Sequence, residues 1–269
     1  MASYNIRYDS PDDAKKGNGW QQRHGAIARM ILFHDFDIIG TQEGLHHQLL
    51  DLQKKLPGYA FAGKGRDDGK SKGEHTAIFF KKSRYELVAE DTFWLSEDTT
   101  QPNKGWDAAL PRVCTWIELR EITSQKRFFV FNTHFDHRGA KARQESARLI
   151  LKKIPEIAGT NPAILMGDFN FDQNNESYAL LQKSGLVGDA YTLAETTYAE
   201  NGTFNNFDIN QKNDHRIDHI FLTNRFKVKK YGVLTDVYWS PGNADGNQAS
   251  RVRIPSDHYP VNVVAVPVN

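Results

Sequence analysis

The sequence predicts a single α/β domain that spans residues 1–269, and three observations support this fold class. Helical and strand patterns alternate along the first half of the chain, and strand patterns then follow one another closely. No repeat, low-complexity tract or linker-like change in composition divides the chain. A length of 269 residues is also sufficient to bury a large core.

Four helices are predicted from apolar residues at helical spacing and from signals at their ends. The longest pattern places Ala147, Ile150 and Ile154 on one face, and Pro57-Gly58 marks the end of an earlier helix. The predicted helices span residues 20–36, 45–56, 140–154 and 177–183.

Strands are predicted where aromatic and β-branched residues are enriched in short runs. These runs span residues 1–7, 37–42, 76–80, 85–94, 113–121, 128–133, 162–166, 217–222, 227–234 and 261–266. Long polar loops, a usual location of function or specificity, are predicted over residues 9–20, 63–74, 96–110 and 200–216.

Composition excludes several classes of protein. The apolar fraction of 39% is that of a globular domain, and no apolar run approaches the roughly 20 residues of a transmembrane helix. A formal net charge of +1 argues against non-specific binding to long nucleic acids. Cys114 is the only cysteine, which excludes an intrachain disulfide, and its apolar surroundings predict a buried side chain.

The segment Gly167-Asp168-Phe169-Asn170 directly follows the apolar run 162–166. Residues two apart on an extended chain point the same way, so Asp168 and Asn170 are expected to face one site. An ordinary turn after a strand is the alternative explanation for these residue types.

Other predicted strand ends bear residues that bind metal ions or transfer protons. Ligands of α/β proteins commonly bind beyond the carboxyl ends of strands, so we expect most of these side chains to converge. They are Asn5, Glu43, His134, Asp218, Asp257 and His258.

In this order along the chain, the motifs resemble those of the endonuclease/exonuclease/phosphatase superfamily, which has the fold of deoxyribonuclease I. The resemblance runs from the first predicted strand to the last. It implies a four-layer α/β (α+β) sandwich of two packed mixed β-sheets flanked by helices. The motifs are Asn5, Gln42-Glu43, Thr133-His134, Gly167-Asp168-Phe169-Asn170, Asp218 and Ser256-Asp257-His258.

The resemblance implies a metal-dependent phosphoester hydrolase that uses an activated water. Glu43 is the main candidate metal ligand, with Asn5 and Asp257 nearby or acting through water. Oxygen ligands of this kind suit Mg²⁺, with Mn²⁺ as a substitute. Glu43 could instead cap the helix that follows it.

The same resemblance assigns roles to catalytic candidates. His258 and Asp218 are expected to pair, Asp168 to orient or deprotonate the attacking water, and Asn170 to donate a hydrogen bond to a phosphoryl oxygen. His134 is expected to contact the phosphate or assist the leaving group. Glu74 occupies the place where deoxyribonuclease-like members have a glutamate paired with that histidine.

Two arginines are candidate phosphate-binding residues, because a guanidinium group can donate two hydrogen bonds to one phosphate. Arg112 and Arg138 lie in segments 111–116 and 131–139, which resemble a bacterial branch of the superfamily. Arg7 and His134 stand where abasic-site endonucleases have an acidic residue and a tyrosine, which argues against that activity.

Two other functions remain as alternatives. One is a catalytically silent module that binds phosphoryl ligands, and the other is a zinc hydrolase, which needs three or four ligands converging on one ion. The expected substrate is a phosphoester, either nucleic acid or a small phosphorylated molecule. We expect a monomer without a membrane span. With no signal-peptide pattern, we expect a cytoplasmic protein, or a periplasmic or secreted one if a targeting segment has been removed.

Overall fold

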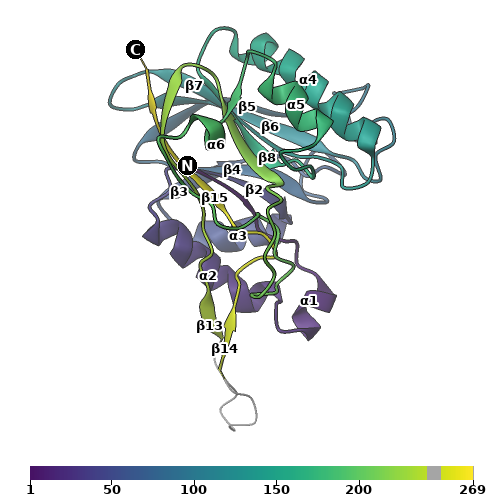
Figure 1. Ribbon diagram of the computed structural model, residues 1–269, viewed down its shortest axis with the longest axis vertical. Helices are drawn as coiled ribbons and strands as arrows, with labels where there is room; N and C mark the ends of the chain where they lie inside the picture. Colours follow the sequence, from purple (N-terminus) through teal and green to yellow (C-terminus); the bar gives the residue numbers. More distant parts are fainter. Residues whose placement is uncertain (241–249, 269) are drawn as a thin grey trace.

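Two β-sheets packed face to face organise the computed structural model, which describes residues 1–240 and 250–268 (Figure 1). Within these residues the first sheet has seven strands and the second has six. In spatial order the first contains β10 (Thr196–Tyr198), β12 (Phe226–Val233), β15 (Val261–Pro267), β1 (Ala2–Asn5), β2 (Ile38–Gly44), β4 (His75–Lys81) and β3 (Tyr59–Ala62).

The second sheet is built around two parallel central strands, β7 and β8. In spatial order it contains β5 (Tyr85–Trp94), β6 (Val113–Glu121), β7 (Arg127–His134), β8 (Ala163–Asp168), β11 (Asp218–Leu222) and β9 (Gly188–Asp189). A separate antiparallel pair of strands, β13 (Tyr238–Ser240) and β14 (Arg251–Arg253), projects from one end of the molecule (Figure 1).

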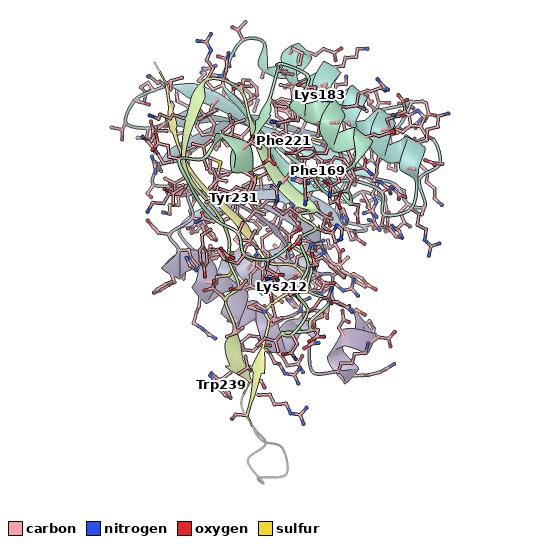
Figure 2. The ribbon with its side chains drawn as sticks, in the orientation of Figure 1. Phe169, Lys183, Lys212, Phe221, Tyr231 and Trp239 are labelled. Carbon is pink, nitrogen blue, oxygen red and sulfur yellow. The ribbon has the colours of Figure 1, made fainter. Side chains whose placement is uncertain are left out.

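Helices cover the outer faces of both sheets (Figure 1). Helices α2 (Trp20–Phe33) and α3 (His46–Lys55) share a hydrophobic cluster with the first sheet, and α4 (Ala140–Ala158) and α5 (Glu176–Gln182) share one with the second. In the latter cluster Phe169 and Phe221 pack edge to face with ring centroids 5.5 Å apart (Figure 2). Two short helices, α1 (Pro11–Lys15) and α6 (Ala190–Leu193), lie in connecting segments.

A third hydrophobic cluster lies between the two sheets. Ile38 and Ile78 from the first sheet and Val130 and Ile164 from the second are all buried in it. The layers are therefore helix, sheet, sheet and helix, and the predicted four-layer fold of the deoxyribonuclease I type is confirmed.

Buried polar side chains join the sheets close to the carboxyl ends of β2 and β7. The amide of Gln42 on β2 donates a 2.7 Å hydrogen bond to Oδ1 of Asn132 on β7. The Nδ2 atom of Asn132 in turn donates to the backbone carbonyl oxygens of Thr41 and Ala77. Because buried polar groups are costly unless they are paired, these bonds fix how the two sheets are aligned.

The predicted elements are found with small shifts in their ends, and short elements were missed. Helix α4 continues through Pro155 to Ala158, whose side chain is buried against the second sheet. Among the missed elements are α1, β3, β13 and β14, each only three to five residues long. Such short segments contain too few residues to display a periodic pattern.

Cys114 is fully buried, as predicted. Among the described residues, no helix combines the length and apolar character required to cross a bilayer.

Candidate active site

Strand register places three of the predicted residues side by side. Parallel pairing of β7 with β8 sets His134 opposite Asp168, and antiparallel pairing of β8 with β11 sets Asp168 opposite Asp218. From the facing sheet, Asn5 reaches across and donates a 3.0 Å hydrogen bond to Oδ2 of Asp168. The carboxyl ends of strands from both sheets therefore meet at one point.

His258 joins this group from the segment that precedes β15. Its Nδ1 lies 2.8 Å from Oδ2 of Asp218, and its Nε2 lies 3.8 Å from Oδ2 of Asp168. The backbone on either side is held by the 200–216 loop, since Asn205 donates to the Asp257 carbonyl and Tyr259 donates to the Thr203 carbonyl. The predicted pairing of His258 with Asp218 is thus present in the geometry.

His134, Asp168 and His258 line a pocket of about 370 Å³. Its wall combines carboxylates, histidines and arginines with a few apolar and aromatic side chains. The lining residues are Arg7, Tyr8, Glu43, Glu74, Leu110, Arg112, His134, His137, Asp168, Asn170, Phe204, Ile217, Asp257 and His258.

Glu43 enters the pocket because of an irregularity in β2. The strand extends through Gly44, its register with β4 shifts between Thr41 and Gly44, and Glu43 has a φ of 64°. Such a bulge redirects a side chain without ending the strand. The alternative that Glu43 caps α3 does not hold, because Leu45 is the N-cap residue.

The three predicted metal ligands are close to one another. Asn5 donates a 3.1 Å hydrogen bond to Oε1 of Glu43, and Nη1 of Arg7 lies 3.8 Å from Glu43 Oε2 and 3.4 Å from Asp257 Oδ2. The Asn5 amide oxygen accepts from the backbone N–H of Arg7, whereas the carboxylates of Glu43 and Asp257 both face the Arg7 guanidinium and offer hard oxygen ligands. The residues present therefore fit a divalent cation of the Mg²⁺ type.

A second set of candidate ligands lies deeper in the pocket. Asp168, Asp218 and His258 each offer one donor atom, and these atoms lie within 4.8 Å of one another. Oδ2 of Asp218 is already engaged by His258, whereas Oδ1 of Asp218 is buried without a hydrogen-bond partner. Oδ1 of Asp218 can therefore act as an oxygen ligand of a metal ion or accept a hydrogen bond from a water molecule.

The two histidines beside Asp168 differ in charge. Burial and the guanidinium groups of Arg112 and Arg66 lower the pKa of His134 well below its ordinary value, so its imidazole is neutral. Burial alone would lower the pKa of His258, but the carboxylates of Asp218 and other nearby aspartates outweigh it and raise the pKa to about 10. One neutral and one cationic imidazole therefore flank a single carboxylate.

Burial also perturbs the carboxylates of the pocket. Together with the negative charge of Asp218, it raises the pKa of Asp168 above the ordinary value, so that this group can accept a proton near neutral pH. Burial likewise raises the pKa of Glu74, to about 7. Titratable groups whose pKa values are pushed in opposite directions are typical of acid–base sites.

Glu74 is the centre of a cluster on one wall of the pocket. Its Oε2 accepts a 2.6 Å hydrogen bond from Arg66 and lies 3.8 Å from Nδ1 of His134. Arg112 lies 4.0 Å from the same oxygen and also contacts Asp136 and His137. Nη1 of Arg112 is buried and has no hydrogen-bond partner.

Asn170 lines the pocket, but its backbone conformation differs from the extended one that the sequence predicted. The chain is not extended after Asp168, because Asn170 has a φ of 51° and its backbone N–H donates to Oδ1 of Asp168. Its side-chain amide donates one hydrogen bond to the carbonyl oxygen of Phe135. An amide nitrogen has two hydrogens, so a second donor remains available.

Arg138, the second candidate phosphate-binding arginine, is not part of the pocket. Its side chain is exposed and does not line the pocket, although its backbone N–H donates to Asp136. By contrast, Arg112 is 4% exposed and lies in the pocket wall.

Sequence reasoning missed several residues of the pocket. Arg7 had been considered only as a departure from another branch, and neither Tyr8, which lines the pocket, nor Arg66, which contacts Glu74 beside it, was a candidate. Arg66 lies in the predicted 63–74 loop, so loop length was the available signal. Nothing local identifies which loop side chain turns inward.

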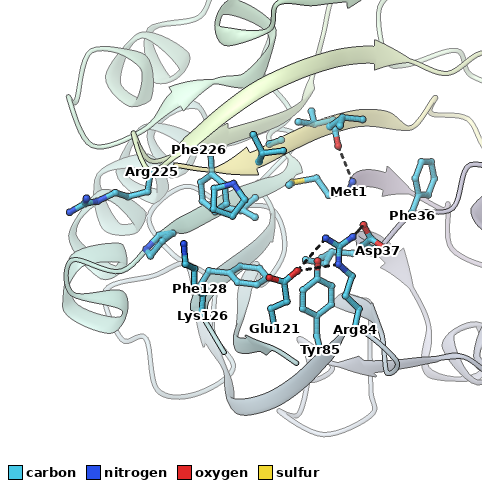
Figure 3. A pocket seen from close by; sticks show the side chains of 18 of the residues that line it. Met1, Phe36, Asp37, Arg84, Tyr85, Glu121, Lys126, Phe128, Arg225 and Phe226 are labelled. Carbon is cyan, nitrogen blue, oxygen red and sulfur yellow. Dashed lines mark hydrogen bonds and ion pairs between the residues drawn. The ribbon is translucent and has the colours of Figure 1, made fainter. Parts of the chain in front are cut away.

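A second, larger cavity of about 580 Å³ lies at the opposite ends of the same strands (Figure 3). It is lined by the beginnings of β2, β5 and β7 and by the end of β15, and it includes none of the predicted site residues. Its wall contains Asp35, Asp37 and Glu121, but these carboxylates are paired with Lys81 and Arg84. We therefore assign the chemistry to the smaller pocket, where carboxylates, histidines and arginines converge.

Comparisons with known proteins identify relatives that match nearly the whole chain. A model of the Endonuclease/Exonuclease/phosphatase family matches residues 2–258. The chain is similar to the solved mannosyl-6-phosphatase of Bacteroides thetaiotaomicron, with 49% identity, 98% of each chain covered and a TM-score of 0.94. It is also similar to a solved endonuclease/exonuclease/phosphatase from Bacteroides vulgatus, with 35% identity, 99% of this chain and 98% of that chain covered, and a TM-score of 0.87.

A more distant similarity links the chain to nocturnin of Drosophila melanogaster, with 26% identity over 89% of this chain. The chain spans 41% of the length of that relative.

Proposed function

The chain belongs to the endonuclease/exonuclease/phosphatase family and is a metal-dependent phosphoester hydrolase, and we propose that it is a Mg²⁺-dependent phosphatase acting on a phosphorylated sugar. The observation that carries the proposal is buried Arg112 in the wall of a small pocket, whose Nη1 makes no hydrogen bond and lies 4.0 Å from Glu74. A guanidinium donor that makes no hydrogen bond suits a terminal phosphate, whose oxygens accept hydrogen bonds on several sides. The Bacteroides thetaiotaomicron relative is a mannosyl-6-phosphatase, which supports a sugar phosphate as the substrate class of this chain.

The size of the pocket favours a small substrate over a polymer. A volume of about 370 Å³ is in the range of small-molecule sites. Tyr8, Leu110 and Phe204 provide apolar and aromatic surface on its wall, against which the faces of a sugar ring can pack. The formal net charge of +1 gives no general attraction for nucleic acid.

Glu43, Asn5 and Asp257 would hold Mg²⁺, and Mn²⁺ could replace it. When bound, the cation would supply Lewis-acid polarisation of a phosphoryl oxygen. The supporting observation is the convergence of the Glu43 and Asp257 carboxylates on Arg7. The zinc alternative is less well supported, because Nδ1 of His258 is already paired with Asp218 and His134 contacts Glu74 and Asp168.

The remaining roles follow from the charge states around Asp168. Its raised pKa and central place suit a group that orients the attacking water and accepts its proton. The cationic imidazole of His258, positioned by Asp218, would stabilise negative charge that develops on the phosphoryl group. Asn170 would donate its second amide hydrogen to the same group, and neutral His134 would bind the phosphate or leaving-group oxygen.

We also infer that residues 1–269 act as one domain and that the enzyme is active as a monomer. In support of a single domain, the pocket is lined by residues from both sheets.

A substrate panel tests the proposal. With Mg²⁺ present, kcat/KM would be compared for hexose 6-phosphates, p-nitrophenyl phosphate, bis(p-nitrophenyl) phosphate, and single- and double-stranded DNA. We expect at least one hexose phosphate to exceed every diester by at least about tenfold, which corresponds to about 1.4 kcal/mol of transition-state stabilisation. Preference for DNA or the chromogenic diester would contradict a phosphatase.

Two variants distinguish catalysis from mere binding. Asp168→Asn removes the proposed water-handling carboxylate and should reduce kcat by at least about a hundredfold. The matched control is Asp172→Asn, whose carboxylate contacts His215 and does not line the pocket. If Asp168→Asn were as active as the parent protein, this catalytic assignment would be wrong. If the parent bound phosphate but hydrolysed nothing, the silent binding module would be favoured.

A further inference from the structure

The two segments that resemble a bacterial branch of the superfamily meet at the buried carboxylate of Asp136. Its Oδ2 accepts hydrogen bonds from Nε of Arg112 at 3.4 Å and from the backbone N–H of Leu110 at 3.3 Å. Its Oδ1 accepts from the backbone N–H groups of Arg138 and Gly139. Although burial opposes ionisation, these donors hold the pKa of Asp136 well below its usual range. The charged carboxylate therefore fixes the segment of Leu110 and Arg112 against the turn that follows β7.

Arg112 in turn determines which nitrogen of His137 bears the ring proton. Nη2 of Arg112 lies 3.0 Å from Nδ1 of His137. Because a guanidinium group can only donate, Nδ1 must accept this hydrogen bond, and the proton of the neutral ring lies on Nε2. Partial burial and the charge of Arg112 also lower the pKa of His137 below its ordinary value. His137 is therefore uncharged at pH 7 and has one N–H donor, on the side of the ring away from Arg112.

His137 lies at the open end of the active-site pocket. Among the described residues that line this pocket, it is the one whose side chain is exposed, whereas all the others are buried or half-buried. Asp168 and His258, at the base, are only 2% and 4% exposed. A phosphoryl group bound at the base would thus leave the alcohol part of a substrate to extend toward His137.

The pocket wall also offers apolar surface to that part of the substrate. Leu110 and Phe204 are half-buried in the wall, and the ring of Phe204 packs edge to face against His258 with centroids 5.2 Å apart. Apolar walls contact the faces of a sugar ring, but its hydroxyl oxygens require hydrogen-bonding groups at fixed positions. An aromatic leaving group needs the apolar wall alone. The Nε2–H of His137 is a fixed donor that distinguishes these two kinds of leaving group.

We propose that His137 is a specificity-determining residue, whose Nε2–H donates a hydrogen bond to an oxygen of the sugar part of the substrate. This inference rests on the proposed hydrolysis of a sugar phosphate and concerns the leaving-group side of the same pocket. Arg112 then serves both ends of the substrate. Its Nη1 is available to the phosphate, while its Nη2 holds His137 in the tautomer that donates to the sugar.

Two substrates with different leaving groups test the hydrogen bond. Mannose 6-phosphate has several oxygens in its sugar, whereas the phenyl group of phenyl phosphate has none besides the ester bridge. With Mg²⁺ present, the ratio of kcat/KM for mannose 6-phosphate to kcat/KM for phenyl phosphate would be measured for the parent and for variants. His137→Phe keeps a ring but removes both nitrogen atoms. His137→Gln keeps an acceptor for Arg112 and an N–H donor for the sugar.

We expect His137→Phe to lower this ratio by at least about fivefold, because one hydrogen bond to the sugar is lost. Loss of the contact with Arg112 should weaken phosphate binding for both substrates equally, so it cancels in the ratio. His137→Gln should restore most of the ratio. His34→Phe is the matched control and should leave the ratio unchanged, because His34 lines the cavity at the opposite ends of the strands.

The tautomer can be measured without a substrate. In ¹H–¹⁵N spectra of the protein labelled at histidine, recorded at pH 7.5, His137 should bear its proton on Nε2 alone. A proton on Nδ1 would overturn the proposal, because the hydrogen bond from Arg112 would then be absent.

Equal losses for both substrates in His137→Phe would overturn the specificity role and leave His137 as a positioning residue for Arg112. A ratio in His137→Gln as low as that in His137→Phe would overturn the hydrogen bond to the sugar. Failure of the proposed function would be seen in the parent protein instead. A parent that hydrolysed no hexose phosphate would contradict the sugar-phosphate assignment, and this inference with it.

Discussion

The Nδ1 atom of His258 lies 2.8 Å from Oδ2 of Asp218, and both side chains are buried at the base of the pocket. His258 reaches this position from the segment before β15, whereas Asp218 begins β11 in the other sheet. The pair therefore joins the two sheets at the place where Asp168 ends β8. Its geometry underlies the first two predictions.

Asp218→Asn should lower the pKa of His258 from about 10, because a neutral amide cannot offset the cost of burying the imidazolium. The resulting loss of the oriented, cationic imidazole should reduce kcat by about a hundredfold to ten-thousandfold. NMR titration of the His258 imidazole and steady-state kinetics at pH 7.5 would measure the two effects. An unchanged His258 titration would contradict the assigned cause, whatever the loss of activity.

Stability of the metal-free protein should depend on His258 at alkaline pH. The folded-state pKa is raised above the ordinary value of 6.5, so the contribution of His258 is fully present below about pH 6.5 and is lost as pH rises through about 10. Urea unfolding of the parent and of His258→Gln, compared between pH 7 and pH 10, should show a converging free energy of unfolding. A difference that stays constant over this range would mean that the imidazole is not held as a cation.

Glu43→Gln should weaken binding of Mg²⁺ by at least about tenfold, because it replaces a charged oxygen ligand with a neutral one. The parent should gain thermal stability when Mg²⁺ is added, since a ligand that binds only the folded state raises Tm. The variant should gain much less at the same concentration. Glu195→Gln is the matched control, because that exposed carboxylate pairs with Lys227 and Lys229 outside the pocket. Equal responses of Glu43→Gln and the parent would exclude Glu43 as a ligand.

Arg23 should act as a positioning residue for the same metal site. Its side chain is fully buried, and its guanidinium donates to backbone carbonyl oxygens after β1 and before Asp257, including those of Arg7 at 2.6 Å and Pro255 at 3.4 Å. Lysine cannot present the same planar set of donors, so Arg23→Lys should weaken Mg²⁺ binding by about tenfold to a hundredfold.

Calorimetric titration of Arg23→Lys with Mg²⁺ separates this effect from a general loss of structure. The control is Arg29→Lys on the same helix, whose side chain is exposed. A destabilised Arg23→Lys protein that binds Mg²⁺ as tightly as the parent would show a purely structural role.

Local sequence patterns were enough to predict the central elements of the fold. Apolar residues at helical spacing predicted α4, and β-branched and aromatic runs predicted β6 and β7 close to their observed bounds. The short motifs, in their order along the chain, resemble those of the superfamily, and this resemblance predicted the four-layer fold. The predicted candidates Glu43, His134, Asp168 and His258 line one pocket and Asn5 bonds to two of them, but their roles remain predictions.

Those patterns do not predict backbone irregularities. Alternation along a strand predicted that Asn170 follows Asp168 on an extended chain. Its φ is 51° instead, although Asn170 still lines the same pocket. Glu43 was expected after a strand and instead occupies a bulge within it. Each departure depends on how a strand meets its neighbours, which is not encoded in the spacing of apolar residues.

The sequence by itself determined which residues could perform phosphoester chemistry and in which order the strands present them, because residue type and periodicity are local properties. Only the tertiary structure decided that Arg112 lines the pocket while Arg138 is exposed, and that Arg7 and Arg66 contact the acidic residues. It also decided that Asn5 meets Asp168, 163 residues away. Such contacts depend on strand register and on the packing of one sheet against the other, which are set by the whole chain.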